Sequence, residues 1–483
     1  MADGVSDPAT TGARRAAVDV AVQLAGRLAN LALGVVVTLL IVRALGDRGF
    51  GQWTTIFAVT QVATAFGDLG LETVAVARAA SDRASEPRWL GALVSVRTLL
   101  AVPVTAASAV VVVLLASNAD MRIAGIVISL TLLLAAVSSL RAVFQLRVRN
   151  DITTALTTLN SVLWAGVVIA VVVADGGIVA LAIGFTAVWF LTIGVQAAIA
   201  LRMGSIELGG LGRLRRELLR VGLPVSVAGL LVTAYVRIDQ VLVFELAGAR
   251  EAGLYGSVYR ILDQAQFVPI AVMTTLFPMM AAAYPHDLRR VRELTQQAGE
   301  YLLMVSLPAL AFAIVAATPT VRLLFGDDFA AAGPALPILL GAFVVIALGH
   351  LVGSLRIVLE LQRRFVVYAA LGLLVNVVLN LVLIPPYGFL AAAWVTLATE
   401  LLVLGLMGLA VTRKLGFHPL LGRIARVVAA ATAMGLSLWG LRALGAGLAV
   451  LAPAALVTYP ALLFGLRALT VEQLRTLRRN PAP

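Results

Sequence analysis

Arginines that stand alone inside long apolar stretches are the residues of this sequence whose type and position suit chemistry. The first such stretch, residues 18–43, carries Arg27 near its centre, and Arg237 and Arg260 lie inside two later stretches. An ionisable side chain at membrane depth costs about 2.5–3.5 kcal/mol on insertion scales and is rarely retained without a partner or a wet cavity. Guanidinium forks match phosphate oxygens and stay charged when they lose water. These three arginines are therefore the first candidates for binding an anionic ligand.

The composition indicates a polytopic membrane protein. Hydrophobic residues make up 61% of the 483 residues and charged residues only 13%, a balance that one soluble domain could not bury. The apolar stretches are continuous and about 20 residues long, which favours helices over the alternating strands of a barrel. The absence of cysteine excludes disulfides, thiolate catalysis and cysteine metal sites. We expect an all-α membrane protein that is not an enzyme and holds no metal or cofactor.

The apolar stretches predict fourteen transmembrane helices with short connections. Their expected bounds are 18–43, 51–76, 90–116, 123–146, 153–174, 178–201, 221–246, 253–281, 301–324, 336–360, 365–385, 389–412, 424–443 and 446–466. We expect two lobes of six helices in a pseudo-twofold arrangement, residues 1–210 and 211–412, followed by a final helix pair and a cytoplasmic tail in residues 413–483.

The distribution of basic residues predicts the orientation. If the amino terminus is cytoplasmic, most of the 37 lysines and arginines fall in cytoplasmic segments, as the positive-inside rule requires. Both termini are then expected on the cytoplasmic side. The net charge of +12 is explained by this topology and by attraction to anionic lipid of the inner leaflet, so a nucleic-acid partner is not expected.

A short motif occurs twice at equivalent hairpins. Residues 46–53 and 248–255 both read G-x-R-x-x-G-x-aromatic, at an offset of 202 residues. A basic amphipathic stretch, residues 213–220, lies between the halves as a cytoplasmic linker. Duplicated halves are typical of secondary transporters, so the repeat favours a transporter of two similar lobes.

Five segments, in order, resemble the polysaccharide flippases of the multidrug/oligosaccharidyl-lipid/polysaccharide exporter superfamily, and the resemblance covers nearly the whole chain. The segments are Arg43 to Gln52, Arg237 to Leu242, Ala252 to Arg260, Leu324 to Phe329, and Asn376 to Gly388. The resemblance implies two inverted-V lobes around a cavity that opens alternately to either side. It also implies transfer of undecaprenyl-(pyro)phosphate-linked oligosaccharides from the inner to the outer leaflet of a bacterial cytoplasmic membrane.

The same resemblance implies partners and site residues. The partners are the lipid-linked glycan, membrane lipids, a polysaccharide polymerase and chain-length machinery. In the related lipid II flippases a cavity arginine group draws on spans one, two and eight. Arg27 and Arg260 match this pattern by span, whereas the second span of this chain has Asp68 and Glu72 and no interior arginine.

Other charged and polar residues inside spans have both structural and functional interpretations. Arg97, Arg141 and Arg356 are further cavity candidates, although they lie in cytoplasmic thirds of spans, where long side chains reach the interface. Asp239, Asp263, Asp68 and Glu72 are candidates for ion pairs or for ion coupling. Because Asp263 is one turn from Arg260 and Asp239 lies at similar depth, a structural ion pair is the alternative for Arg260. Asn376 and Asn380 share a helix face and either join helices or line the cavity.

Three rival functions stay open at this point. A multidrug or cation exporter of the same superfamily needs carboxylates deep in its cavity, where arginines outnumber Asp239 and Asp263. A twelve-span facilitator is a weaker alternative, since residues 46–49 only superficially match its signature hairpin. A membrane glycan polymerase needs a sizeable outer loop with carboxylates, and the sequence has none. The final two spans, almost free of interior charge, suit either a groove for a lipid tail or simple packing.

Overall fold

The structure, a computed structural model, describes residues 8–416 and 421–469 and confirms an all-helical fold. No strand occurs among these residues, and ten of their helices are long and apolar enough to cross a membrane. The count of fourteen spans stays a prediction. The side chains outside the description are those of residues 8–29, 31, 150, 224–226, 228, 363 and 421.

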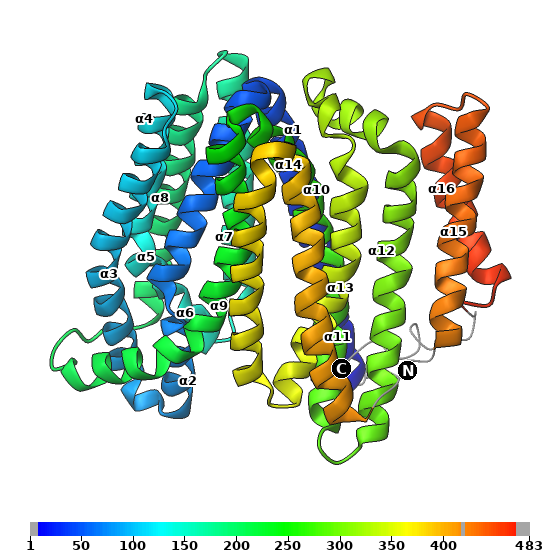
Figure 1. Cartoon of the computed structure of the whole chain (residues 1–483). Coiled ribbons are helices and arrows are strands. Elements are labelled where there is room, and N and C mark those ends of the chain that lie inside the picture. The colour runs from blue at the N-terminus through cyan, green and yellow to red at the C-terminus, as the bar shows by residue number, and fades with distance from the viewer. Residues whose placement is uncertain (1–7, 417–420, 470–483) are drawn as a thin grey trace, which may run out of the picture. The chain divides into compact units, whose positions relative to one another are not determined.

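The chain forms two compact units, and unit 1 consists of residues 1–45 and 59–229. Its α-helices belong to α1 (Pro8–Asp68), α2 (Leu71–Ser81), α3 (Glu86–Leu115), α4 (Ala119–Ser129), α5 (Ala135–Ser138), α6 (Ala142–Leu146), α7 (Asn150–Val173), α8 (Ile178–Met203) and the first half of α9 (Gly212–Ala247). Short 3₁₀ segments connect some of them: η1 (Arg83–Ser85), η2 (Leu130–Leu134) and η3 (Ser139–Arg141). Helix α3 packs against α2 and α4, and α8 packs against α4 and α7 (Figure 1).

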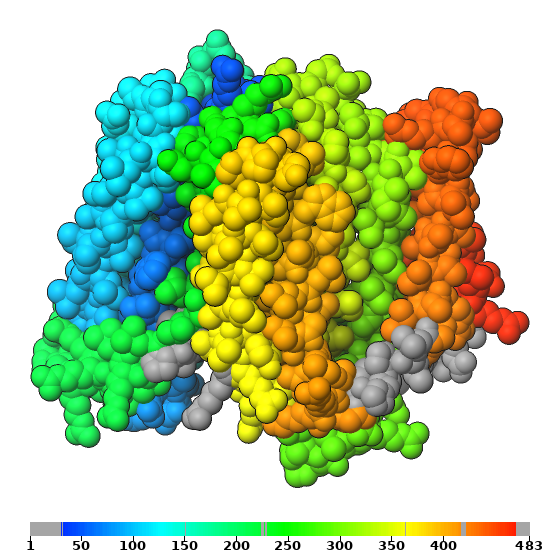
Figure 2. Space-filling view, in the orientation of Figure 1, coloured from blue at the N-terminus to red at the C-terminus, as the bar shows by residue number. Residues whose placement is uncertain are grey.

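Unit 2 consists of residues 46–58 and 230–483. Beyond the second half of α9 its helices are α10 (Ala249–Ala265), α11 (Phe267–Ala283), α12 (Leu288–Phe325), η4 (Asp327–Ala332), α13 (Ala335–Val358), α14 (Gln362–Leu415), α15 (Leu421–Ala443) and α16 (Leu448–Gly465). Helix α13 packs between α12 and α14. The α15–α16 pair packs on α12 and forms a separate column beside it in Figure 2.

Glycines in a left-handed conformation break the helices at both copies of the repeated motif. Gly46 (φ 64°, ψ −175°) separates the two predicted spans that share α1, and Gly248 (φ 92°, ψ 173°) precedes α10. Gly326 and Gly388, in the two later motifs, also have positive φ. A side chain with a Cβ is strained at such angles, so only glycine turns the chain sharply there. The motif is thus a turn signal as well as a repeat.

The two copies of the motif also pack against each other within unit 2. A Cβ at Gly51 would collide with the carbonyl oxygen of Ala249, and a Cβ at Gly253 with that of Asp47. The Nε of Arg250 donates to the Asp47 carboxylate at 2.8 Å. Small residues let helix backbones cross this closely. This crossing explains why residues 46–58, although they belong to α1, are part of unit 2.

We therefore expect Gly51→Ala and Gly253→Ala to lower stability by about 1–3 kcal/mol, because the added methyl forces two backbones apart. Thermal unfolding of the purified protein measures the loss. Gly194→Ala is the matched control, since a Cβ there meets nothing within 4 Å. Equal melting temperatures for all three variants would contradict the close crossing.

Candidate functional site

A buried polar cluster surrounds Asp239 in unit 2, at the meeting point of α9, α10 and both halves of α14. The Asp239 carboxylate is 2% exposed. It accepts hydrogen bonds from Asn380 Nδ2 at 2.8 Å, Thr396 Oγ1 at 2.7 Å and the Tyr255 hydroxyl at 3.3 Å. Asn380 Nδ2 also donates to Asn376 Oδ1 at 3.1 Å. The structure thus brings together three residues that the sequence singled out, and adds Thr396 and Tyr255.

The cluster has the chemistry of a site for a proton or a monovalent cation. Among the described residues no lysine or arginine pairs with Asp239, so its negative charge is stabilised by neutral donors alone. The Asn380 amide oxygen is buried without a hydrogen-bond partner in the described part of the chain. Ionisable groups at membrane depth are retained chiefly for function, and carboxylate, amide and hydroxyl oxygens suit an alkali cation. Within the same residues no group of three or more acidic, histidine or cysteine side chains could hold a metal ion.

A second group in unit 2 joins Arg237 of α9 to Asp263 of α10. Arg237 Nη1 lies 3.1 Å from one Asp263 carboxylate oxygen, and Nη2 lies 3.4 Å from the other. The Arg237 guanidinium also lies 5.7 Å from the centre of the Tyr259 ring. The Arg237 side chain is 22% exposed and that of Asp263 is 16% exposed, so the pair is partly buried but still accessible. This fork is the geometry in which arginine also binds two phosphate oxygens.

Arg260 lacks the ion pair that the sequence offered as an alternative. Asp263 pairs with Arg237 rather than Arg260, and Asp239 is engaged by neutral groups. No hydrogen bond or salt bridge joins Arg260 to another described residue, although it lies one turn before Asp263 on α10. Arg260 is therefore a partly buried cation with capacity for an anion. Arg27 lies in α1, and its side chain is outside the described residues.

In unit 1 an ion network joins Asp68, Glu72, Arg97 and Arg141. The Arg97 side chain is 5% exposed; it pairs with Asp68 and lies 3.6 Å from Glu72, while its Nη1 donates to Ser139 at 2.9 Å. Glu72 also accepts from Arg141 Nε at 2.7 Å. Arg97 is thus neutralised inside the unit, which supports the structural interpretation of this arginine.

The second predicted span is interrupted inside this network, contrary to the continuous helix expected for residues 51–76. Helix α1 ends at Asp68 and α2 begins at Leu71, with Leu69 at φ 43° and Gly70 at φ 59°. Asp68 and Glu72 are therefore not neighbours on one regular helix. Instead Arg97 binds one carboxylate on each side of the break and holds the two segments together.

Arg356 lies at the cytoplasmic end predicted for its span, on α13. Its guanidinium lies over the Phe365 ring at 3.6 Å from the centroid. A cation stacked on an aromatic face is stabilised without a carboxylate. This contact favours a structural role for Arg356.

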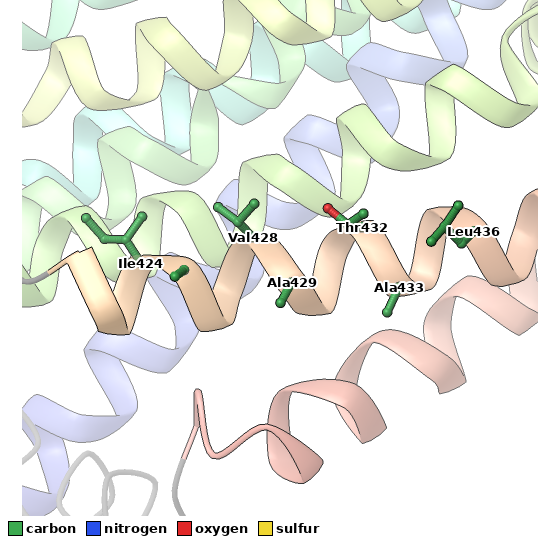
Figure 3. A pocket seen from close by; sticks show the side chains of 7 residues that line it. Ile424, Val428, Ala429, Thr432, Ala433 and Leu436 are labelled. Carbon is green, nitrogen blue, oxygen red and sulfur yellow. The ribbon is translucent and has the colours of Figure 1, made fainter.

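An apolar groove of about 580 Å³ runs along α15. Figure 3 shows Ile424, Val428, Thr432 and Leu436 along one edge, at the spacing of one helical turn. The complete lining is Ile424, Ala425, Val428, Ala429, Thr432, Ala433 and Leu436. Arg423, next to the start of the groove, pairs with the buried carboxylate of Glu300 at 3.1 Å. The surface suits an acyl or prenyl chain, and the charge of Arg423 near one end is already neutralised by Glu300.

Several polar residues of these clusters escaped the sequence analysis. Tyr255 was noted only as the aromatic residue of the second motif copy, and Thr396 gave no signal, because a hydroxyl inside an apolar helix is common. Glu300 lay just before a predicted span, and only its spacing of four residues from Gln296, which donates to it at 2.6 Å, hinted at a buried pair. Glu400, inside the twelfth predicted span, is a further acid that the comparison of acids with arginines inside the spans did not include.

Comparisons with known proteins agree with the all-helical fold and identify a family. A family model described as polysaccharide biosynthesis protein matches residues 40–334. No curated protein matches the sequence.

Solved structures of transporters are similar in fold. The structure titled lipid II flippase MurJ, inward closed conformation, superposes with a TM-score of 0.73 at 10% identity, covering 91% of this chain and 97% of that one. An inward-facing multidrug resistance MATE family transporter gives 0.63 at 13% identity, covering 80% and 95%. The structure of a MOP superfamily transporter from Pyrococcus furiosus superposes with a TM-score of 0.53 at 14% identity, covering 82% of this chain and 93% of that one. Its title reports reverse polarity of the binding pocket.

We expect Arg97→Met to destabilise the protein by about 3–5 kcal/mol, because it leaves buried carboxylates uncompensated. The triple variant Arg97→Met/Asp68→Asn/Glu72→Gln should recover most of the loss. Thermal unfolding measures both, with Arg289→Ala as a control whose side chain is 90% exposed. A mild effect of Arg97→Met, or no recovery in the triple variant, would contradict the role of Arg97 as a clamp.

Proposed function

Because the chain belongs to the polysaccharide biosynthesis protein family, we propose that it flips lipid-linked oligosaccharides from the inner to the outer leaflet by alternating access. The carrier lipid is an undecaprenyl (pyro)phosphate. The membrane is the bacterial cytoplasmic membrane, with both termini in the cytoplasm, and the protein acts as a transporter rather than an enzyme. The resemblance of the fold to a lipid II flippase supports the proposal.

The observation that carries the proposal is Arg260, which makes no salt bridge to any described residue, beside the Arg237–Asp263 pair. Such a substrate can leave its tail in lipid, but its phosphates and sugars must cross about 30 Å of hydrocarbon. Shielding them requires positive charge at depth, and a guanidinium without a carboxylate partner supplies it. Arg260, Arg237 and Arg27 are proposed to hold the head group. Asn376 and Asn380, committed to the Asp239 cluster, are assigned to coupling rather than to sugar contacts.

The α15 groove is proposed to hold the prenyl tail during transfer. Its lining is apolar except for Thr432. Burying a prenyl chain there gains about 25 cal/mol for each Å² of apolar surface removed from water, and little relative to lipid. The groove therefore guides the tail rather than binding it tightly, so the head group determines affinity.

The Asp239 cluster is proposed to couple transport to a proton or a monovalent cation. A ligand that binds one conformation better than the other shifts the equilibrium between them. The cluster joins α9, α10 and both halves of α14, so a change in its charge acts on segments that carry Arg237 and Arg260. Polymerase and chain-length proteins are proposed as downstream partners.

A multidrug or cation exporter is the second candidate. The buried carboxylate of Asp239 and the similarity of the fold to MATE transporters favour it. Against it stands Arg260, which makes no salt bridge within the described part of the chain, since a cationic drug gains nothing from such a guanidinium. The two functions differ in the role of the arginines: in a flippase they bind the anionic head group, whereas in an exporter of cations they do not contact the substrate.

We expect Arg260→Ala to lower surface polysaccharide at least about tenfold in cells that depend on this protein, and Arg260→Lys to restore it in part, because lysine keeps the charge but loses the fork. Immunoblots of the glycan, with the membrane level of each variant measured in parallel, give the readout. Arg289→Ala, on an exposed helix surface, is the control. Normal polysaccharide from a correctly inserted Arg260→Ala variant, with changed drug accumulation, would favour the exporter.

We expect the melting temperature of the wild-type protein to rise with its coupling ion, because a ligand at 100 times its Kd stabilises by about 2.7 kcal/mol. Sodium, potassium and choline chloride at equal ionic strength, and a pH series, identify the ion. Asp239→Asn should remove the response, whereas Glu293→Gln, an exposed acid, should keep it. A wild-type protein insensitive to all of these conditions would rule out coupling through this cluster.

A further inference from the structure

Helix α7, one of the candidate membrane spans of unit 1, has two exposed faces of opposite chemistry. One face consists of apolar or small residues at alternating spacings of four and three, all exposed: Ala155, Leu159, Val162, Gly166, Ile169 and Val173. On the opposite side of a helix with about 3.6 residues per turn lie Thr153 and Thr157, both exposed, and the half-buried Ser161. These three residues form the hydroxyl face of α7.

Neighbouring helices separate the two faces. On one flank of α7, Asn30 Nδ2 of α1 donates to Thr158 Oγ1 at 3.0 Å. On the other flank, Asn160 Nδ2 donates to Thr192 Oγ1 of α8 at 3.1 Å. With a helix on each flank, the apolar face and the hydroxyl face look in opposite directions. The apolar face is the one that suits lipid, so the hydroxyl face is directed away from lipid.

The hydroxyl face offers hydrogen-bond acceptors rather than donors. Thr157 Oγ1 donates to the Thr153 carbonyl oxygen at 2.8 Å, and Ser161 Oγ donates to the Thr157 carbonyl oxygen at 3.0 Å. Each hydroxyl has one proton, and with that proton in use its oxygen can only accept. An ionised phosphate cannot donate a hydrogen bond, whereas the hydroxyl of a sugar can. Such back-bonding is also tolerated in lipid, so the position of these hydroxyls, rather than their number, indicates a ligand.

Aromatic rings border the hydroxyl face. Trp164 follows Ser161 by three residues on α7, and its ring meets the Phe185 ring of α8 edge to face at 5.3 Å. Phe185 in turn stacks with Trp189, with ring centres 6.1 Å apart. All three aromatic side chains are half-buried, so part of each is accessible. No charged residue occurs in the sequence of α7 after Asp151. Aromatic surface beside a few polar groups is typical of sites for small neutral ligands.

We infer that the hydroxyl face of α7 and the three adjoining aromatic rings form a surface in unit 1 that binds neutral sugar rings of the transported glycan. The inference rests on the proposed function and adds the contacts for the sugars, since the arginines are assigned to the phosphates. A sugar ring has hydroxyl donors at its edge and C–H groups on its faces, which match acceptor oxygens and aromatic rings. On the proposed topology, the hydroxyl face lies in the cytoplasmic half of α7, the side from which the substrate enters.

The test measures dissociation constants of two lipid probes for the full-length protein in nanodiscs. One probe is the lipid-linked oligosaccharide extracted from source cells that lack the protein, and the other is undecaprenyl diphosphate, which has no sugar. We expect the wild-type protein to prefer the oligosaccharide probe. Thr157→Val/Ser161→Ala should bind this probe about tenfold more weakly, because two acceptors are lost, and should bind undecaprenyl diphosphate as wild type does. Thr98→Val is the matched control, since Thr98 is exposed on α3 and donates to the Val94 carbonyl oxygen at 2.8 Å.

The outcomes separate this inference from the proposed function. Equal binding of both probes by the wild-type protein overturns the sugar surface and leaves the flippase proposal standing. The surface is also overturned if the double variant keeps the wild-type preference or weakens both probes equally. If the wild-type protein binds neither probe, the proposed function itself fails, and the inference with it. Thr157→Val alone keeps the side-chain volume and should lose about threefold for the oligosaccharide probe, so an unchanged preference in this variant is decisive even if the double variant does not fold.

Discussion

The free-energy cost of removing a charged side chain from water is the constraint on which the arrangement of polar residues in this protein depends. Three of the most deeply buried charges among the described residues are compensated in different ways. Arg97 has two carboxylates, Glu300 has Arg423 and Gln296, and Asp239 has three neutral donors. Compensation by an opposite charge produces a rigid clamp, whereas compensation by neutral donors leaves a charge that a mobile ion can still neutralise.

The geometry of the backbone determines the positions of these charged side chains. Gly46 and Gly248 turn the chain at the predicted outer ends of helices, and Gly51 and Gly253 allow the turned segments to cross at backbone distance. Gln240 then donates to Thr54 at 2.9 Å across the same crossing. Arg237, Asp239 and Gln240 lie within about one turn of α9, and Gln240 also donates to the Ala252 carbonyl oxygen at 3.0 Å, so α9 is tied to both copies of the motif. On the same helix, Asp239 contacts the buried cluster, and Arg237 contacts Asp263 and Tyr259.

Sequence reasoning reached some parts of the candidate site and missed others for identifiable reasons. Arginines and acids inside apolar stretches are visible because charge is rare there, so Arg237, Arg260, Asp239 and Asp263 were found. Thr396 and Tyr255 were missed, since these residue types are ordinary in membrane helices. The break at Leu69 and Gly70 was also missed, because apolar periodicity continues through it and a leucine at positive φ has no sequence signal.

The sequence by itself determined the all-helical membrane fold, the family and the repeated glycine turns, because hydrophobic length and glycine conformation are local properties that few alternative structures satisfy. The partners of each charge were decided only by tertiary structure. Arg260 and Asp263 are one turn apart in sequence, yet Asp263 binds Arg237 of another helix. Side-chain pairing depends on the rotation and crossing of packed helices, and these follow from contacts between residues far apart in the chain.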